Sequence, residues 1–110
     1  MLSLNRRYQR VGLACRSNVM MDNYCFSAVT EDLSLNGVSI LTDQRLPVGK
    51  KASITLDLPA VSISSPVTIN GVVTRNKADG LAFEFKSLNH ETFALLRTVI
   101  SRKMHPTQWQ

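Results

Sequence analysis

The sequence has few of the residues that catalysis and metal binding require. Its 110 residues include only two histidines and two cysteines, and none falls in a recognisable nucleophile or metal-ligand spacing. Five scattered glycines form no loop that would hold a phosphate. Glu31 and Asp32 are the only adjacent acids, and neighbours in a strand point to opposite faces, so they are not expected to share a proton. We therefore expect neither an enzyme nor a metal site.

Long hydrophobic runs are also absent. No stretch reaches the length that spans a bilayer, and the first residues, MLSLNRRYQR, contain no apolar run of signal-peptide length. We expect a cytoplasmic protein without membrane insertion, a location in which thiols stay reduced. Cys15 and Cys25, each within an apolar stretch, are then expected to be two buried free thiols. A disulfide between them is the alternative if their segments pair.

Positive charge is concentrated at the start of the chain. Residues 1–16 carry four arginines and no acid, whereas residues 17–110 hold the other nine basic residues against all eight acids. A general nucleic-acid-binding protein more often spreads its basic residues over a face or a helix. The cluster formed by Arg6, Arg7 and Arg10 therefore predicts a compact anionic partner or a loose electrostatic arm, and no specific nucleic acid.

Most of the chain has the pattern of β-strands. Residues 52–58, ASITLDL, alternate apolar and polar side chains, and so do residues 81–85, in which Ala82 and Glu84 are expected to face outward. Gly71 is expected to mark a bulge or a bend in a long strand. The other expected strands cover residues 11–18, 24–31, 37–42 and 66–76, with MMDN at 20–23 as a break.

From residue 89 the pattern changes to the period of a helix. Asn89 suits the N-cap, and Arg102 and Lys103 suit the last turn. The apolar residues expected on one face are Phe93, Leu96, Val99 and Ile100. About six short strands and one closing helix predict an all-β fold, either a small antiparallel barrel or a sandwich, with the helix covering an open end.

The segment EDLSLNG, residues 31–37, has two interpretations. Its Asn-Gly dipeptide and its Asp and Ser residues are typical of a turn. If the segment is extended instead, Asp32 and Ser34 face the same side and could bind the edge of a guanine. Gly37 would then leave room for a ligand, while the arginines bind phosphates or guanine. One anionic guanine nucleotide would account for both motifs.

Together the two motifs resemble the PilZ domain family of bacterial cyclic di-GMP receptors. The family signature is R-x-x-x-R in an N-terminal loop followed by [D/N]-x-S-x-x-G, which RRYQR at 6–10 and DLSLNG at 32–37 match. The resemblance implies a six-stranded antiparallel β-barrel with a C-terminal α-helix. It divides the chain into a flexible arginine arm (1–10), a PilZ-like barrel (11–88), a helix packed on the barrel (89–104) and a tail (105–110).

The resemblance also implies a function. Cyclic di-GMP would be the ligand, with no cofactor, and would reorder the arm so that the protein signals to a separate, unidentified partner protein. The implied binding residues are Arg6, Arg7, Arg10, Asp32, Ser34 and Gly37. One or two ligands per chain, and a monomer or a dimer, remain open alternatives. The rival hypotheses are a ligand-independent PilZ-like interaction module, a nonspecific binder of polyanions and, most distantly, an enzyme acting on the nucleotide.

Overall fold

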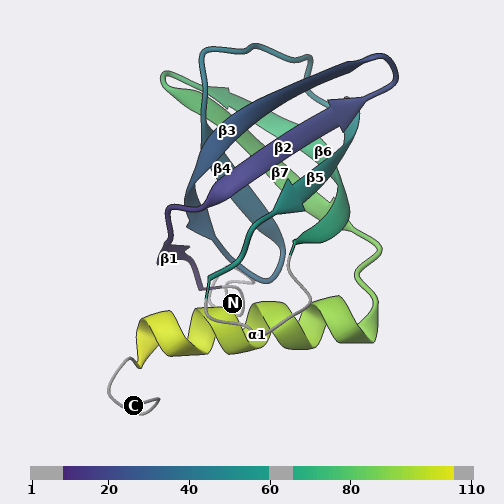
Figure 1. The fold of residues 1–110 in the computed structure, drawn as a ribbon. Coiled ribbons are helices and arrows are strands. Elements are labelled where there is room, and N and C mark those ends of the chain that lie inside the picture. The colour runs from purple at the N-terminus through teal and green to yellow at the C-terminus, as the bar shows by residue number, and fades with distance from the viewer. Residues whose placement is uncertain (1–8, 60–65, 106–110) are drawn as a thin grey trace, which may run out of the picture.

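The computed structural model describes residues 9–59 and 66–105, which form an antiparallel barrel and a helix (Figure 1). The strands β2 to β7 pair in the order β3-β2-β5-β6-β7-β4, and β4 pairs again with β3, so six strands close the barrel. The elements are β1 (Val11–Gly12), β2 (Arg16–Met21), β3 (Tyr24–Leu33), β4 (Gly37–Leu41), β5 (Lys51–Leu56), β6 (Val67–Lys77), β7 (Gly80–Lys86) and α1 (His90–Met104). The predicted six-stranded β-barrel with a C-terminal helix is confirmed.

The barrel interior is filled by every second residue of its strands. Ile54 and Leu56 are completely buried, and Leu58 is buried just beyond the end of β5, as the alternation in residues 52–58 predicts. Each such side chain contributes about 1.5–3 kcal/mol on burial. The least exposed apolar side chains of the other strands are Val19, Leu33, Val38, Ile40, Val73, Leu81 and Phe83.

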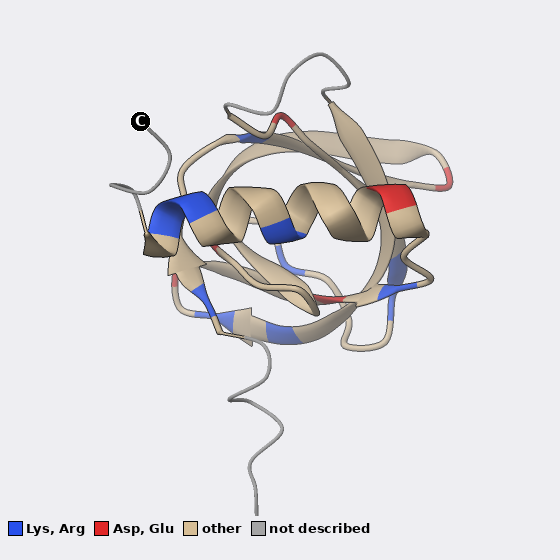
Figure 2. Ribbon diagram, turned by 90° about the horizontal axis from the view of Figure 1, so that it is seen from below, with Lys and Arg blue, Asp and Glu red and all other residues tan. Residues whose placement is uncertain are grey.

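Helix α1 lies across one end of the barrel (Figure 2). It begins at the predicted cap, where the Asn89 side chain accepts a hydrogen bond from the backbone N–H of Thr92 at 2.8 Å. The helix buries Leu96, Val99 and Ile100 against the core, whereas Phe93, expected on the same face, is 38% exposed. Within the described residues, no helix is long and apolar enough to cross a membrane.

Two strand boundaries near the N-terminus differ from the prediction. Residues 11–18 do not form one strand. Residues 13–15 separate β1 from β2, and these three residues lie opposite only Thr30 and Glu31 of β3. The break expected at residues 20–23 is shorter than predicted: its turn residues Asp22 and Asn23 are confirmed, but Met20 and Met21 belong to β2, and Met21 pairs with Tyr24. Only Asp22 and Asn23 form the turn. Met21 is buried, so its side chain holds the strand in place up to that point.

Two β-bulges change which side chains point outward. In β3, Thr30 pairs with Ile40 and Asp32 with Ser39, so Glu31 is an extra residue between them. In β6 the extra residue is Thr74, and not Gly71, where we expected a bulge or bend. Gly71 serves close packing instead, because a Cβ there would lie 2.7 Å from the Cδ1 atom of Ile54.

Thr30 ties the N-terminal segment to the barrel. Its hydroxyl group is buried, accepts a hydrogen bond from the backbone N–H of Cys15 at 2.8 Å and donates one to the backbone carbonyl of Leu13. These bonds satisfy two backbone groups in the irregular stretch between β1 and β2. Residues 13–15 are therefore held against β3, and β1 pairs with the end of that strand.

The two cysteines are free, but neither is fully buried as expected. Cys15 is half-buried beside Thr30, and Cys25 is exposed on the outer face of β3. Burial raises the pKa of the Cys15 thiol above its ordinary value, and the hydrogen bond from Thr30 offsets part of that rise. Cys15 is therefore less ionised at neutral pH than an unperturbed thiol.

Replacing Thr30 by valine is expected to lower the free energy of unfolding by about 1–3 kcal/mol, since one buried and one partly buried backbone hydrogen bond are lost. Urea denaturation measures the change. The matched control is Thr68→Val, because the Thr68 hydroxyl group contacts that of Thr55 at 3.0 Å on the exposed surface. That control is expected to stay within about 0.5 kcal/mol of the wild type. Equal effects of the two substitutions would contradict the role of Thr30.

The thiols should also differ in reactivity. At pH 7.5 we expect Ellman's reagent to modify Cys25 at least roughly tenfold faster than Cys15, because thiolate fraction and access control the rate. The Cys15→Ser and Cys25→Ser variants isolate each thiol. The rate at Cys15 should keep rising in the pH range where an unperturbed thiol is already ionised. Equal rates for the two variants would show that Cys15 is neither shielded nor perturbed.

Candidate functional site

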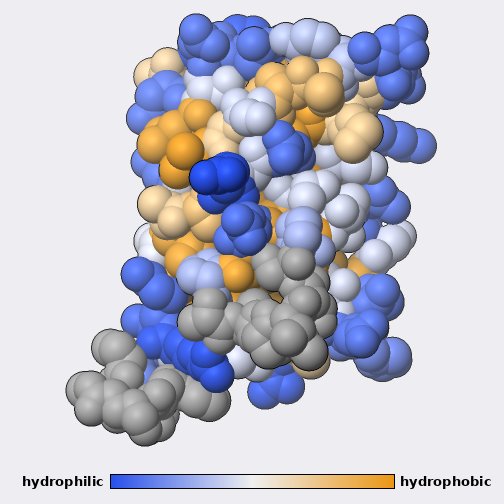
Figure 3. Space-filling model, in the orientation of Figure 1, coloured by the Kyte–Doolittle hydropathy of each residue, from blue (hydrophilic) through white to orange (hydrophobic). Residues whose placement is uncertain are grey.

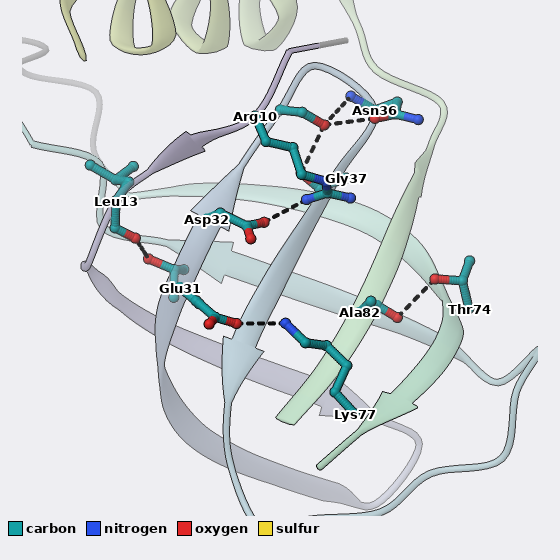
Figure 4. Close-up of polar contacts among 11 residues, drawn as sticks. Arg10, Leu13, Glu31, Asp32, Asn36, Gly37, Thr74, Lys77 and Ala82 are labelled. Atoms are coloured by element: carbon teal, nitrogen blue, oxygen red, sulfur yellow. Dashed lines mark hydrogen bonds and ion pairs between the residues drawn. The ribbon is translucent and has the colours of Figure 1, made fainter. Parts of the chain in front are cut away.

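The candidate ligand-binding residues gather where β1, β3 and β4 meet, at the end of the barrel near the helix (Figures 1 and 4). Arg6 and Arg7 lie outside the described residues, so the structure places neither of them. The other four predicted residues are Arg10, Asp32, Ser34 and Gly37.

Arg10 and Asp32, one residue from each motif, form an ion pair. The Nη1 atom of Arg10 lies 2.5 Å from the Oδ1 atom of Asp32, and both side chains are open to solvent, 45% and 26% exposed. The pair forms because β1 runs antiparallel to the end of β3, with Gly12 opposite Asp32. The structure therefore places the last arginine of R-x-x-x-R directly beside the first residue of D-x-S-x-x-G.

The bulge in β3 places two acidic side chains on the same surface. Thr30 and Leu33 point into the barrel, whereas Glu31 and Asp32 between them both point outward. The expectation that these neighbours face opposite sides is wrong, because the extra residue breaks the two-residue period. Each acid has its own basic partner, Lys77 for Glu31 and Arg10 for Asp32 (Figure 4).

Ser34 does not share a face with Asp32 as the extended interpretation required. Strand β3 ends at Leu33, and the Ser34 side chain is completely buried in the turn that follows. Its hydroxyl group donates to the Oδ1 atom of Asn36 at 2.6 Å and accepts from the Asn36 backbone N–H at 3.2 Å. Its backbone N–H donates to the carbonyl of Gly37 at 2.9 Å. In this conformation Ser34 shapes the β3–β4 turn, as the turn interpretation predicts.

Gly37 is required by the packing of β4 against β7. It is buried, pairs with Glu84, and a Cβ at this position would collide with the backbone carbonyl of Phe83. The space that we assigned to a ligand is thus occupied by the neighbouring strand. A glycine here lets β4 start close to β7, which sets the position of the turn carrying Ser34.

A row of outward-facing residues crosses the barrel wall from Asp32. The strand registers place Ser39 of β4 beside Asp32, Ala82 of β7 beside Ser39 and Arg75 of β6 beside Ala82. Ser39 and Ala82 occupy outward positions but are only 4% and 6% exposed, so longer neighbouring side chains cover them. Ala82 faces outward as expected. Because its side chain is small, the outer surface between Asp32 and β6 is lower at this position.

Lys77 was not identified from the sequence. It lies at the end of β6, yet its Nζ atom is 2.5 Å from the Oε1 atom of Glu31 on β3. Since β7 and β4 lie between those strands, the two side chains meet across two intervening strands. No local pattern marks Lys77, because the contact depends on the register of four strands and on the bulge at Glu31.

The arrangement can bind anions and hydrogen-bond donors. It offers guanidinium and ammonium groups for anions and a carboxylate that accepts hydrogen bonds. Among the described residues, no group of three or more histidine, cysteine, aspartate or glutamate side chains could hold a metal ion.

Several solved structures share the fold, among them proteins from Escherichia coli, Bacillus subtilis and a cellulose-synthesizing bacterium. The PilZ domain of YcgR from Escherichia coli, solved with c-di-GMP, has a TM-score of 0.71 and 17% identity and covers 94% of both chains. MotI/DgrA, the inhibitor of motility from Bacillus subtilis, has a TM-score of 0.75 and 17% identity, over 90% of this chain and 51% of that one. The PilZ domain of CeSA from a cellulose-synthesizing bacterium has a TM-score of 0.63 and 16% identity, over 90% and 98%.

The present chain thus spans about half the length of MotI and nearly the full length of the isolated YcgR domain. At these identities the likeness shows the fold. No curated protein sequence matches the chain. The sequence profile of the PilZ domain, however, matches residues 4–102, a range that includes both motifs and the barrel. The chain therefore belongs to the PilZ domain family.

Proposed function

We propose that this protein is a receptor for cyclic di-GMP. The observation that carries the proposal is the Arg10–Asp32 ion pair, which joins the two motifs on one outer wall of the barrel. Membership of the PilZ family supports the same ligand, as does the PilZ domain of YcgR, which was solved with c-di-GMP. The cyclic dinucleotide has two phosphates and two guanines, and so matches a site that combines arginines with a carboxylate.

In this proposal the phosphates and a guanine are bound by different groups. Arg6, Arg7 and Arg10 would bind the phosphates through charge-assisted hydrogen bonds, which are often bidentate. The carboxylate of Asp32 would accept hydrogen bonds from the N–H groups of a guanine edge. Asp32 retains exposed surface for this contact while it pairs with Arg10.

Ser34 and Gly37 would contribute mainly through the shape of the wall. The Ser34 hydroxyl group stabilises the turn, and Gly37 allows β4 to approach β7, so together they set the geometry next to Asp32. A direct bond from Ser34 to the ligand would require the turn to open, because the side chain is completely buried.

The proposed output is a change in the arginine arm that a separate partner protein detects. A solvent-exposed ion pair such as Arg10–Asp32 contributes only about 0–1 kcal/mol. A ligand with two phosphates can therefore replace the pair, or extend it, at little energetic cost. The arm, residues 1–10, would then adopt a new position on the barrel wall, an order–disorder type of switch.

A second candidate is a protein-interaction module that does not depend on the ligand. It is favoured by apolar side chains that are exposed on the outer face of β2, β3 and β4, where Figure 3 shows apolar patches. Met20 is 51% exposed, Val29 46% and Leu41 41%, and Val29 lies directly beside Leu41. Exposed apolar clusters often mark protein contacts. This candidate predicts no heat of binding with cyclic di-GMP and a partner indifferent to the nucleotide.

Calorimetric titration with cyclic di-GMP tests the leading proposal. We expect saturable binding by the wild type, and about a tenfold or greater loss of affinity in Arg10→Ala, because a lost charged hydrogen bond removes about 1.5–3 kcal/mol. Asp32→Ala should weaken binding as well. The stoichiometry of the titration also distinguishes one ligand per chain from two.

The matched control is Arg45→Ala, which removes the same charge from a loop at the other end of the barrel. The Arg45 guanidinium group donates to the backbone carbonyls of Gln44 and Ala78. Its removal should leave the affinity within about twofold of the wild type. Absence of saturable binding by the wild-type protein would refute the proposed function, and unchanged affinity in Arg10→Ala would refute the role of that arginine.

A further inference from the structure

The ion pair between Lys77 and Glu31 joins two strands that are not neighbours in the barrel. With strands about 4.8 Å apart, β6 and β3 are separated by about 14 Å of barrel wall. The pair nevertheless closes to 2.5 Å, and the Lys77 side chain is only 20% exposed. The register places Lys77 opposite Gly80 of β7, and the next outward residues toward Glu31 are Ala82 of β7 and Ser39 of β4. Small residues therefore border the crossing of the two long side chains.

The pair also borders the proposed ligand site. Glu31 and Asp32 are consecutive and point outward together, so the charges of the two ion pairs run in the order Arg10, Asp32, Glu31, Lys77 (Figure 4). A bound dianion would meet an arginine on one side. On the other side, the carboxylate of Glu31 would repel the dianion if Lys77 did not neutralise its charge. The Lys77 ammonium group is the cation that contacts Glu31 on that side.

Surface ion pairs of this kind are exchangeable. An ion pair that remains partly open to water gains little, and a lysine ammonium group is a compact charge on a flexible side chain that can bind a phosphate instead. Glu31 is 39% exposed, so water can solvate its carboxylate when the Lys77 ammonium group moves away.

We propose that Lys77 is a further ligand-binding residue of this site, which Glu31 holds beside Asp32 until cyclic di-GMP arrives. On binding, the Nζ atom transfers from the Glu31 carboxylate to a phosphate oxygen on the side of the ligand away from Arg10. Glu31 thereby acts as a competitor of the ligand and limits its affinity. This inference rests on the proposed function and adds to it a residue that lies in neither sequence motif.

The test compares two substitutions whose expected effects have opposite signs. Lys77→Met should weaken cyclic di-GMP binding by about tenfold, through loss of a charged contact and exposure of the Glu31 charge. Glu31→Gln should strengthen it by about two- to fivefold, because the competitor and its repulsion are removed. Calorimetric dissociation constants measure both, and thermal unfolding of each variant confirms that the barrel is folded.

The control pair is Lys50 and Asp22, whose Nζ and Oδ2 atoms lie 3.4 Å apart near the β2–β3 turn. Lys50→Met and Asp22→Asn make the same charge changes there and should each leave affinity within about twofold of the wild type.

Three results would overturn the inference. An unchanged affinity in Lys77→Met, while Arg10→Ala loses binding, would refute the role of Lys77 and leave the proposed function intact. A loss of affinity in both Lys77→Met and Glu31→Gln would show a purely structural pair. No binding by the wild-type protein would refute the function and this inference together.

Discussion

The single extra residue in β3 is the constraint on which the site depends. Because Glu31 has no partner in β4, the two-residue period of the strand is interrupted, and Thr30 and Leu33 both point inward. The acidic side chains of Glu31 and Asp32 are then presented together on the outer wall. Without the bulge, one of the two carboxylates would point into an apolar barrel, where an unpaired charge is strongly unfavourable.

The inward residue before the bulge connects the barrel to the N-terminal arm. Thr30 satisfies the backbone of residues 13 and 15 and so holds β1 along the end of β3. Arg10, which directly precedes β1, therefore reaches Asp32 without a dedicated loop. Buried interactions thus position groups whose own contacts are weak and solvent-exposed, a combination that would let the proposed ligand replace those contacts without disturbing the barrel.

Local patterns in the sequence predicted the elements whose determinants are local. The alternation in residues 52–58 and the Asn89 cap hold in the structure, because a period or a cap needs only neighbouring residues. The misplaced features depend on distant partners. Gly71 packs against Ile54 instead of bending its strand, Met21 stays in β2 because the core buries it, and Cys25 faces solvent within an apolar stretch.

The sequence by itself determined the family, the barrel with its closing helix and the two motifs, because these are recorded in residue types and short spacings. Only the tertiary structure decided how the motif residues are used. It paired Arg10 with Asp32, buried Ser34 in a turn, assigned Gly37 to strand packing and brought Lys77 to Glu31 across two strands. The physical reason is register: a bulge of one residue, invisible in composition, sets which side chains share a face and which strands lie beneath them.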